Sequence, residues 1–208
     1  MLVDKQEIAI IANAKQKNVR DPNRSRDHFL RIFDDFLIGY DFSDKSWLDL
    51  GPGQFDFAEL AREKGAAVHN VDNDPAVLEL GRFKGFTSIE GNLKHFNQID
   101  FPNVFYDGLF CKFSINAFWM AEDISLVEKY TDDLVAKLKP NFTAWVAPWN
   151  GVPKKISLTD VEIAKIVDTQ KNSFINHGFD ARELSVEQAK YYGVNGVVAN
   201  NIVFTKGL

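Results

Sequence analysis

The residues best suited to chemistry lie in two short stretches, around residue 50 and around residue 72. Gly51 and Gly53 separate an apolar run from a run with helical spacing, so the sequence predicts a strand, a glycine turn and a helix. Glycine takes backbone angles that other residues avoid, and it lets a ligand approach the main chain closely. The free N–H groups of the following helix would face that ligand, which suits a polar or anionic group.

An acid follows the turn at a spacing that suits a ribose. Residues 67–71 predict a second strand, and this strand ends at Asp72, about 20 residues after the glycine turn. A carboxylate at this point of a β-α-β unit can accept hydrogen bonds from both ribose hydroxyls. The spacing therefore predicts a cofactor that contains adenosine and does not decide which one.

Two further acids separate the candidate cofactors. A dinucleotide fingerprint has glycine where this chain has Asp56, and a carboxylate there would repel a pyrophosphate. Asp49, before the first glycine, instead suits a cationic group such as an amine or a sulfonium. An NAD-dependent oxidoreductase is therefore a disfavoured alternative.

The segments 49–53 (Asp-Leu-Gly-Pro-Gly) and 71–75 (Val-Asp-Asn-Asp-Pro) together resemble motifs of the class I S-adenosylmethionine-dependent methyltransferases. The resemblance covers roughly residues 46–205 and departs from the family at Phe55, where a third glycine would fall. It implies an α/β, Rossmann-like fold. Its seven-stranded, mostly parallel sheet has the order 3-2-1-4-5-7-6, with the last strand antiparallel and helices on its flanks.

The resemblance also implies the cofactor, S-adenosylmethionine, which leaves as S-adenosylhomocysteine. Asn92 would accept a hydrogen bond from the adenine amino group, and Leu93 would pack on the adenine ring. The residues assigned to cofactor binding are Asp49, Gly51, Gly53, Asp72, Asn73, Asn92, Leu93, Lys112 and Phe113.

The chain of 208 residues is expected to form one domain, 1–208, with an N-terminal helical cap at 1–45 and a core at 46–208. Leading helices in the resembled family often cap the active site, and a simple cover over the sheet edge is equally open. Helices are expected at 4–18, 25–38, from 57 onward, and at 75–82, 123–138 and 159–177. Strands are expected at 47–50, 67–72, 87–90, 107–113, 142–147, 179–184 and 197–205.

The identity of a catalytic base stays open. Methyl transfer from a sulfonium is an in-line displacement, so the protein mainly aligns the reactants and excludes water. Many small-molecule O-methyltransferases of this class have a histidine after the fourth strand, where this chain has Asn116 and Ala117. His28 is the candidate base, although a single helical histidine is more often a surface or packing residue. A tyrosine base, an amine acceptor or proximity alone are the other possibilities.

Substrate contacts are expected where ligands bind in open α/β sheets, beyond the carboxyl ends of the strands. The candidates are Asn116, Trp119, Trp149, Asn150 and Tyr191. Aromatic residues at these positions could equally belong to the core. Cys111 is expected to be a buried strand residue rather than a nucleophile.

Composition limits the function classes. Hydrophobic residues make up 45% and charged residues 25%, as in soluble globular proteins. No run predicts a membrane span or a signal peptide, so a cytoplasmic location is the default. A net charge of −5 argues against nucleic acid as a partner, and no residue spacing supports a metal site.

The sequence thus predicts methyl transfer to a small-molecule acceptor, since it shows no added recognition domain and has an acidic balance. A non-catalytic binding or scaffold protein with the same fold is the alternative, and the oligomeric state is left open.

Overall fold

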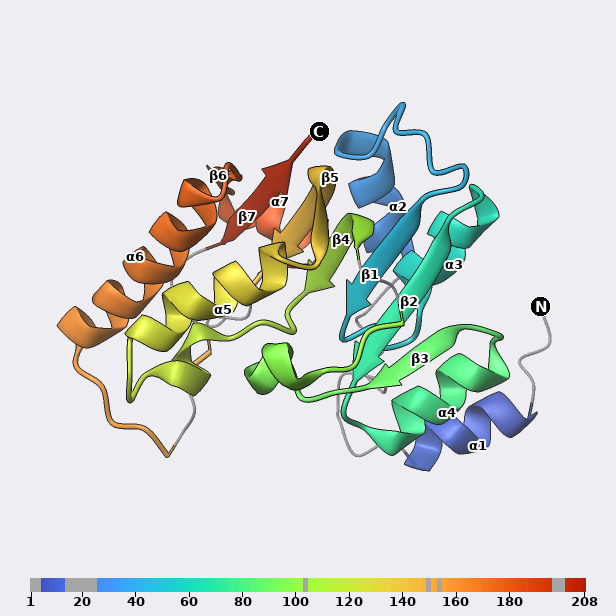
Figure 1. Cartoon of the computed structure of the whole chain (residues 1–208), viewed down its shortest axis with the longest axis horizontal. Coiled ribbons are helices and arrows are strands. Elements are labelled where there is room, and N and C mark those ends of the chain that lie inside the picture. Colours follow the sequence, from blue (N-terminus) through green and yellow to red (C-terminus); the bar gives the residue numbers. More distant parts are fainter. Residues whose placement is uncertain (1–4, 14–25, 103–104, 149–150, 153–154, 196–200) are drawn as a thin grey trace.

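The chain folds around a seven-stranded sheet with the strand order β3-β2-β1-β4-β5-β7-β6, as the resemblance implied (Figure 1). A computed structural model describes residues 5–13, 26–102, 105–148, 151–152, 155–195 and 201–208. Neighbouring strands from β3 to β5 run parallel, whereas β7 runs antiparallel to both β5 and β6. The strands are β1 (Ser46–Leu50), β2 (Ala67–Asp72), β3 (Thr87–Glu90), β4 (Tyr106–Lys112), β5 (Leu138–Ala147), β6 (Asp180–Glu183) and β7 (Ile202–Lys206).

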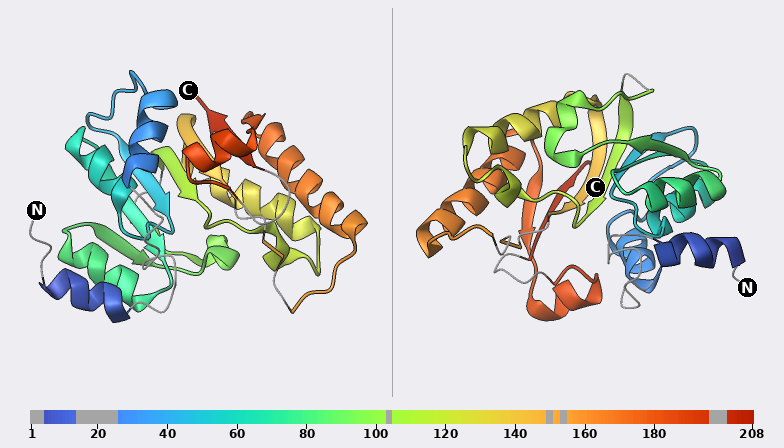
Figure 2. Two further views of the ribbon diagram at one scale, coloured as in Figure 1. Left: turned by 180° about the vertical axis from the view of Figure 1, so that it is seen from behind. Right: turned by 90° about the horizontal axis from the view of Figure 1, so that it is seen from below.

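Helices cover both faces of the sheet. Figure 1 shows α5 and α6 in front of it, and the view from behind in Figure 2 brings α2, α3 and α7 forward. The α-helices are α1 (Lys5–Asn13), α2 (Arg26–Asp35), α3 (Asp56–Glu63), α4 (Pro75–Phe83), α5 (Ser125–Val135), α6 (Asp160–Asn176) and α7 (Val186–Tyr191). Two short 3₁₀ helices, η2 (Leu93–Gln98) and η3 (Ala117–Met120), follow β3 and β4. Among the described residues, no helix has the length and apolar character needed to cross a membrane.

Stacked aromatic rings fill the core between the sheet and helices α2 and α3. Phe57 of α3 stacks on Phe110 of β4 with ring centroids 4.0 Å apart, and Phe110 stacks on Trp145 of β5 at 5.0 Å. Phe29 of α2 contacts the same Phe110 ring at 5.9 Å. Burial of each such ring contributes on the order of 1.5–3 kcal/mol. The phenylalanines of this face are therefore packing residues that hold the central strands and α2 together.

The two leading helices lie in different places. α1 packs beside α4, and the Glu7 carboxylate pairs with the Lys84 ammonium at 2.9 Å. α2 instead packs on α3, where Arg26 pairs with Glu59 at 2.7 Å and with Glu63 at 3.0 Å. Only α2 therefore contributes rings to the stack over the central strands.

Several elements differ from those expected, among them α2, which ends at Asp35, and α5, which spans Ser125–Val135. β5 already begins at Leu138 and extends past Pro140, whereas the expected helix 123–138 was to end at this point and the expected strand to begin only at residue 142. The predicted strand 197–205 is observed as β7 from Ile202, while 196–200 and the end of the first predicted helix lie outside the described residues. Helix α7 was not predicted at all.

Candidate functional site

The site is built where the strand order reverses, at the carboxyl ends of the adjacent strands β1 and β4, and such switch points hold ligands in open α/β sheets. Gly51 and Gly53 follow β1 with φ of +68° and +58°, a region that favours glycine. The Gly51 N–H donates to the carbonyl of Val71 at 2.9 Å, which ties the turn to β2. A side chain at Gly51 would overlap the Ser114 side chain, because its Cβ would come within 2.5 Å of the Ser114 Cβ.

Phe55 ends the turn in a glycine-like conformation. Its φ is +69° although it carries a large side chain, and its ring is fully buried. The ring stacks on Phe86 at 5.5 Å and lies so close to Gly81 of α4 that a Cβ there would come within 2.7 Å of it. Phe55 is also the N-cap of α3 and makes no side-chain cap hydrogen bond, so no side chain at the cap position covers the first N–H groups of the helix.

The predicted ribose acid stands at the end of β2 with a fixed orientation. Asp72 is 7% exposed, and its Oδ1 accepts a hydrogen bond from the Asp74 N–H at 2.8 Å. Asp74 in turn caps α4, because its carboxylate accepts from the Ala76 N–H at 3.0 Å. Asn73 lies between these two acids and is exposed. The local turn therefore holds the Asp72 carboxylate in place just beside the glycine turn.

Asp49 and Lys112 are ionisable residues near the ends of the central strands. Asp49 is 2% exposed on β1 and lies opposite Phe110 of β4 in the sheet register. Lys112 ends β4, is 4% exposed, and holds its ammonium 4.6 Å from the centroid of the Phe29 ring. Phe113 follows with φ of +67°, and its N–H donates to the carbonyl of Ala147 at 2.7 Å.

The predicted adenine contacts begin η2. Asn92 is exposed and caps η2, with its Oδ1 accepting from the Lys94 N–H at 3.0 Å. An amide oxygen has two lone pairs, so it retains capacity for a second donor. Leu93 is buried at 8% exposure. The loop after β3 therefore has a defined conformation next to the end of β2.

His28 lies on α2 near the carboxyl end of β4. Its half-buried ring lies against Gly193, where an added Cβ would come within 2.7 Å of the ring. Among the described residues, the buried Nδ1 has no hydrogen-bond partner. Burial lowers the pKa of His28, the positive charges of Lys112 and Arg31 lower it further, and Asp27 opposes them. The imidazole is therefore favoured in its neutral form, which can accept a proton.

The predicted substrate residues differ in burial and in their hydrogen bonds. Asn116 is fully buried, and its amide donates to the Gly151 carbonyl at 2.9 Å and accepts from the Phe118 N–H at 2.9 Å. This geometry favours a role in holding the loop after β5 against η3. Trp119 is half-buried in η3, while Trp149 and Asn150 lie outside the described residues.

Tyr191 ends α7 on the same side of the sheet as α2. The residue is 46% exposed, and the Arg31 guanidinium lies 4.4 Å from the centroid of its ring. Arg31 also donates to the main-chain carbonyl of Tyr191 at 2.8 Å, which joins α2 to α7.

Sequence reasoning missed two residues of this region, Ser114 and Gly193. Neither belongs to a motif, because their importance comes from contacts with Gly51 and His28, far away in the chain. Gly193 had one detectable signal: Ser185 and Gln188 form a capping box that predicts the start of a short helix, and a glycine is the typical residue just after a helix end. Among the described residues, no group of three or more histidine, cysteine or acidic side chains could hold a metal ion.

Comparisons with known proteins give structural matches only. A comparison with protein-family models found no match, and a search of curated protein sequences found no significant one. A SAM-dependent methyltransferase from Archaeoglobus fulgidus is 18% identical, with 91% of this chain and 97% of that chain covered at a TM-score of 0.51. A SAM-dependent methyltransferase from Aquifex aeolicus is 14% identical, and the match covers 96% of this chain and 97% of that chain at a TM-score of 0.53. A methyltransferase of the same kind from Mesorhizobium loti is 16% identical, and the match covers 79% of this chain and 91% of that chain at a TM-score of 0.53. With the strand order given above, these matches show that the chain has the class I SAM-dependent methyltransferase fold.

Proposed function

We propose that this protein transfers a methyl group from S-adenosylmethionine to a small-molecule acceptor. The observation that carries the proposal is the pairing of a glycine turn after β1 with an oriented acid, Asp72, after β2. The Gly51 N–H bonds to the Val71 carbonyl, so the turn and the acid sit side by side. Neighbours in the same fold class that are SAM-dependent methyltransferases support this choice.

The cofactor would lie across the carboxyl ends of β1, β2 and β4. Asp72 would accept hydrogen bonds from the ribose hydroxyls, and the glycine turn would let the amino-acid portion approach the main chain. Asn73, Asn92 and Leu93 would surround the adenine. Asp49 suits the cationic groups of the cofactor, while Lys112 beside Phe113 suits its carboxylate.

When bound, S-adenosylmethionine supplies an activated methyl group. The protein's part is to align the acceptor atom with that group and to keep water away. If the acceptor is a hydroxyl, the neutral His28 ring would take its proton; an amine with a free lone pair needs no base. Half-buried Trp119 and exposed Tyr191 would form apolar walls for a small acceptor.

One observation disfavours a dinucleotide cofactor. The Asp56 carboxyl stands where a dinucleotide fingerprint has its third glycine, and it occupies the first position of α3. Burial and the neighbouring Glu59 raise the pKa of Asp56, while Arg26, Lys84 and Lys112 oppose that shift. A non-catalytic scaffold remains the alternative function, distinguished by the absence of turnover with any acceptor.

The ribose contact is tested by replacing Asp72 with alanine. Calorimetric titration with S-adenosylhomocysteine should show affinity reduced by about 100-fold, because two charge-assisted hydrogen bonds are lost. Glu90→Ala is the matched control, since Glu90 is the exposed acid that lies opposite Asp72 in the sheet register. Its affinity should stay within about twofold of the parent. Unimpaired binding by the Asp72 variant would overturn the site assignment.

A further inference from the structure

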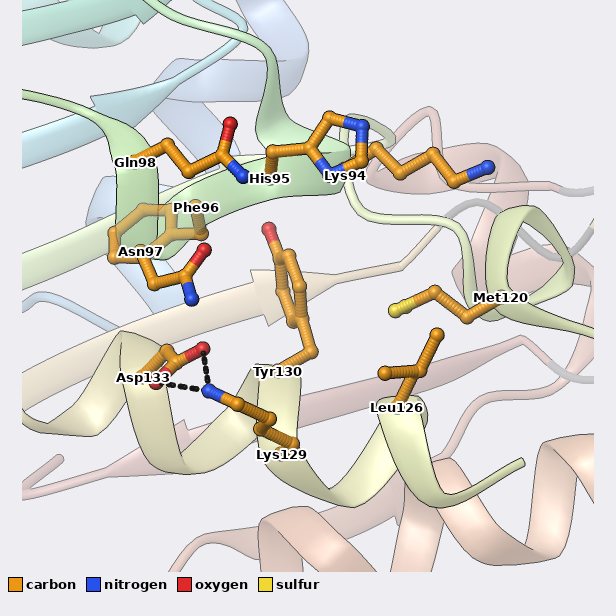
Figure 3. Close-up of a pocket in the computed structure, with 10 residues that line it drawn as sticks. All are labelled: Lys94, His95, Phe96, Asn97, Gln98, Met120, Leu126, Lys129, Tyr130 and Asp133. Carbon is orange, nitrogen blue, oxygen red and sulfur yellow. Dashed lines mark hydrogen bonds and ion pairs between the residues drawn. The ribbon is translucent and has the colours of Figure 1, made fainter. Parts of the chain in front are cut away.

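A pocket between η2 and α5 lies on the face of the sheet opposite to α2 and α3. It has a volume of about 200 Å³ and opens between the two helices (Figure 3). Its floor and sides include the apolar residues Phe96, Met120 and Leu126. Among the described residues of the connection from β3 to β4, η2 is the only helix, and Leu126 of α5 is 43% exposed.

The hydroxyl of Tyr130 is buried in this pocket without a partner. Tyr130 is 6% exposed, and among the described residues its hydroxyl has no hydrogen-bond partner. Figure 3 shows the hydroxyl pointing from α5 toward the residues of η2. A buried polar group without a partner is costly, so a ligand atom that pairs with it would gain binding free energy. Burial raises the pKa of Tyr130 well above its usual value, so the hydroxyl stays protonated and can donate.

The surroundings of the hydroxyl favour a flat, uncharged molecule. The Phe96 ring stands edge-on to the Tyr130 ring at 6.0 Å, and the Met120 thioether points into the space beside it (Figure 3). Aromatic rings and thioethers both make favourable contacts with a further ring. At the rim, Lys129 and Asp133 pair with each other at 2.8 Å, so their charges largely compensate.

The volume limits the size of the ligand. Drug-sized ligands occupy pockets of about 300–1,000 Å³, whereas an apolar cavity of about 150 Å³ suffices for benzene. We propose that this pocket is a second ligand site that binds a small, neutral, single-ring aromatic molecule whose hydrogen-bond acceptor pairs with the Tyr130 hydroxyl. This site does not depend on the methyl-transfer proposal, because it lies on the α5 face and uses none of the residues assigned to the cofactor.

Benzamide is a suitable probe, because it carries one ring and a carbonyl acceptor. Titration of the full chain, followed by amide chemical shifts, should show saturable changes at residues 94–98 with a dissociation constant on the order of 1 mM. Benzoate, which carries a charge, should bind more weakly. Saturating S-adenosylhomocysteine should not displace benzamide; competition between them would overturn the claim of a separate site.

Two variants test the residues. Tyr130→Phe should weaken benzamide binding by about 3- to 10-fold, and should not lower the melting temperature of the ligand-free protein, because the hydroxyl has no partner to lose. Leu126→Trp should abolish binding by filling the pocket, and it should be tolerated because Leu126 is 43% exposed. The matched control is Tyr40→Phe, a half-buried tyrosine packed on the other face of the sheet, with unchanged binding. Unchanged affinity in Tyr130→Phe, a lower melting temperature in that variant, or binding that persists in Leu126→Trp would each overturn the proposal.

Discussion

Phe55 combines a glycine-like backbone with a large buried ring. The left-handed conformation costs a residue with a side chain about 1–2 kcal/mol, and the ring repays this cost by packing between Phe86 and Gly81. The residue therefore keeps the backbone path of the turn while filling space that a glycine would leave empty. This explains why departure from the family pattern at one position leaves the turn intact.

Replacing Phe55 separates the two effects. Phe55→Ala and Phe55→Gly should both lose about 3–5 kcal/mol of unfolding free energy with the ring. At the positive φ of this position alanine is strained and glycine is not. The glycine variant should therefore have the higher free energy of unfolding, by about 1 kcal/mol in urea unfolding. Phe57, buried inside α3, is the control, because there alanine should be more stable than glycine by about 1 kcal/mol. The same order at both positions would refute the account of Phe55.

His28 gives the stability a defined dependence on pH. Its folded-state pKa is lowered by burial and by Lys112 and Arg31, so the unfolded chain binds the proton more readily. The pKa of a histidine in the unfolded chain is about 6.5. Stability should therefore fall as the pH drops from this value toward the lower pKa of the folded state. Burial lowers the pKa of His69 as well, which adds a contribution of the same sign.

The contribution of His28 can be isolated by substitution. His28→Gln should lose less stability than the parent between about pH 7 and about pH 5.5, measured as the shift in urea midpoint. His69→Gln is the comparison variant, because burial lowers the pKa of His69 as well, and it should reduce the loss of stability at acid pH in the same direction. If the stability of His28→Gln falls with decreasing pH as steeply as that of the parent protein, His28 is not the cause of the pH dependence.

At the scale of elements, the turn after β1 depends on its contact with the chain after β4. Gly51→Ala should weaken S-adenosylhomocysteine binding by about 10-fold or more, because its Cβ would overlap Ser114 and its φ of +68° would be strained. Adding Ser114→Gly should restore part of the affinity by removing the overlap, while the strain remains. Titration of both variants tests this coupling. If Ser114→Gly does not restore affinity in the Gly51→Ala background, the turn after β1 and the chain after β4 are not coupled in this way.

Elements with strong local signals were predicted well from the sequence. The capping box of Thr159 and Glu162 starts α6, and the pair Asp74-Pro75 starts α4, both as expected. The early start of β5 was missed because pairing of Leu138 with Tyr106 of β4 overrides the local helix-stop signal at Pro140. Helix α7 was missed because it is only 6 residues long and lacks a clear apolar period, although its capping box was present.

At the scale of the whole molecule, the strand order brings distant motifs together. The resemblance correctly implied this order, and with it the meeting of the β1 turn, Asp72 and Lys112 at one edge. Contacts such as those of His28 with Gly193 and of Gly51 with Ser114 could not be predicted, because no periodicity or motif encodes pairs so far apart. Sequence therefore predicts which residues could bind the cofactor, and the fold adds the residues that position them.

The most direct test of the central claim is calorimetric titration of the intact chain with S-adenosylhomocysteine, with NAD as the comparison ligand. The account predicts one saturable site for S-adenosylhomocysteine with a dissociation constant of about 1–100 μM, and no saturable binding of NAD up to about 1 mM. Saturable NAD binding without a response to S-adenosylhomocysteine would contradict the cofactor assignment. Absence of binding by both would leave a scaffold with this fold as the better description.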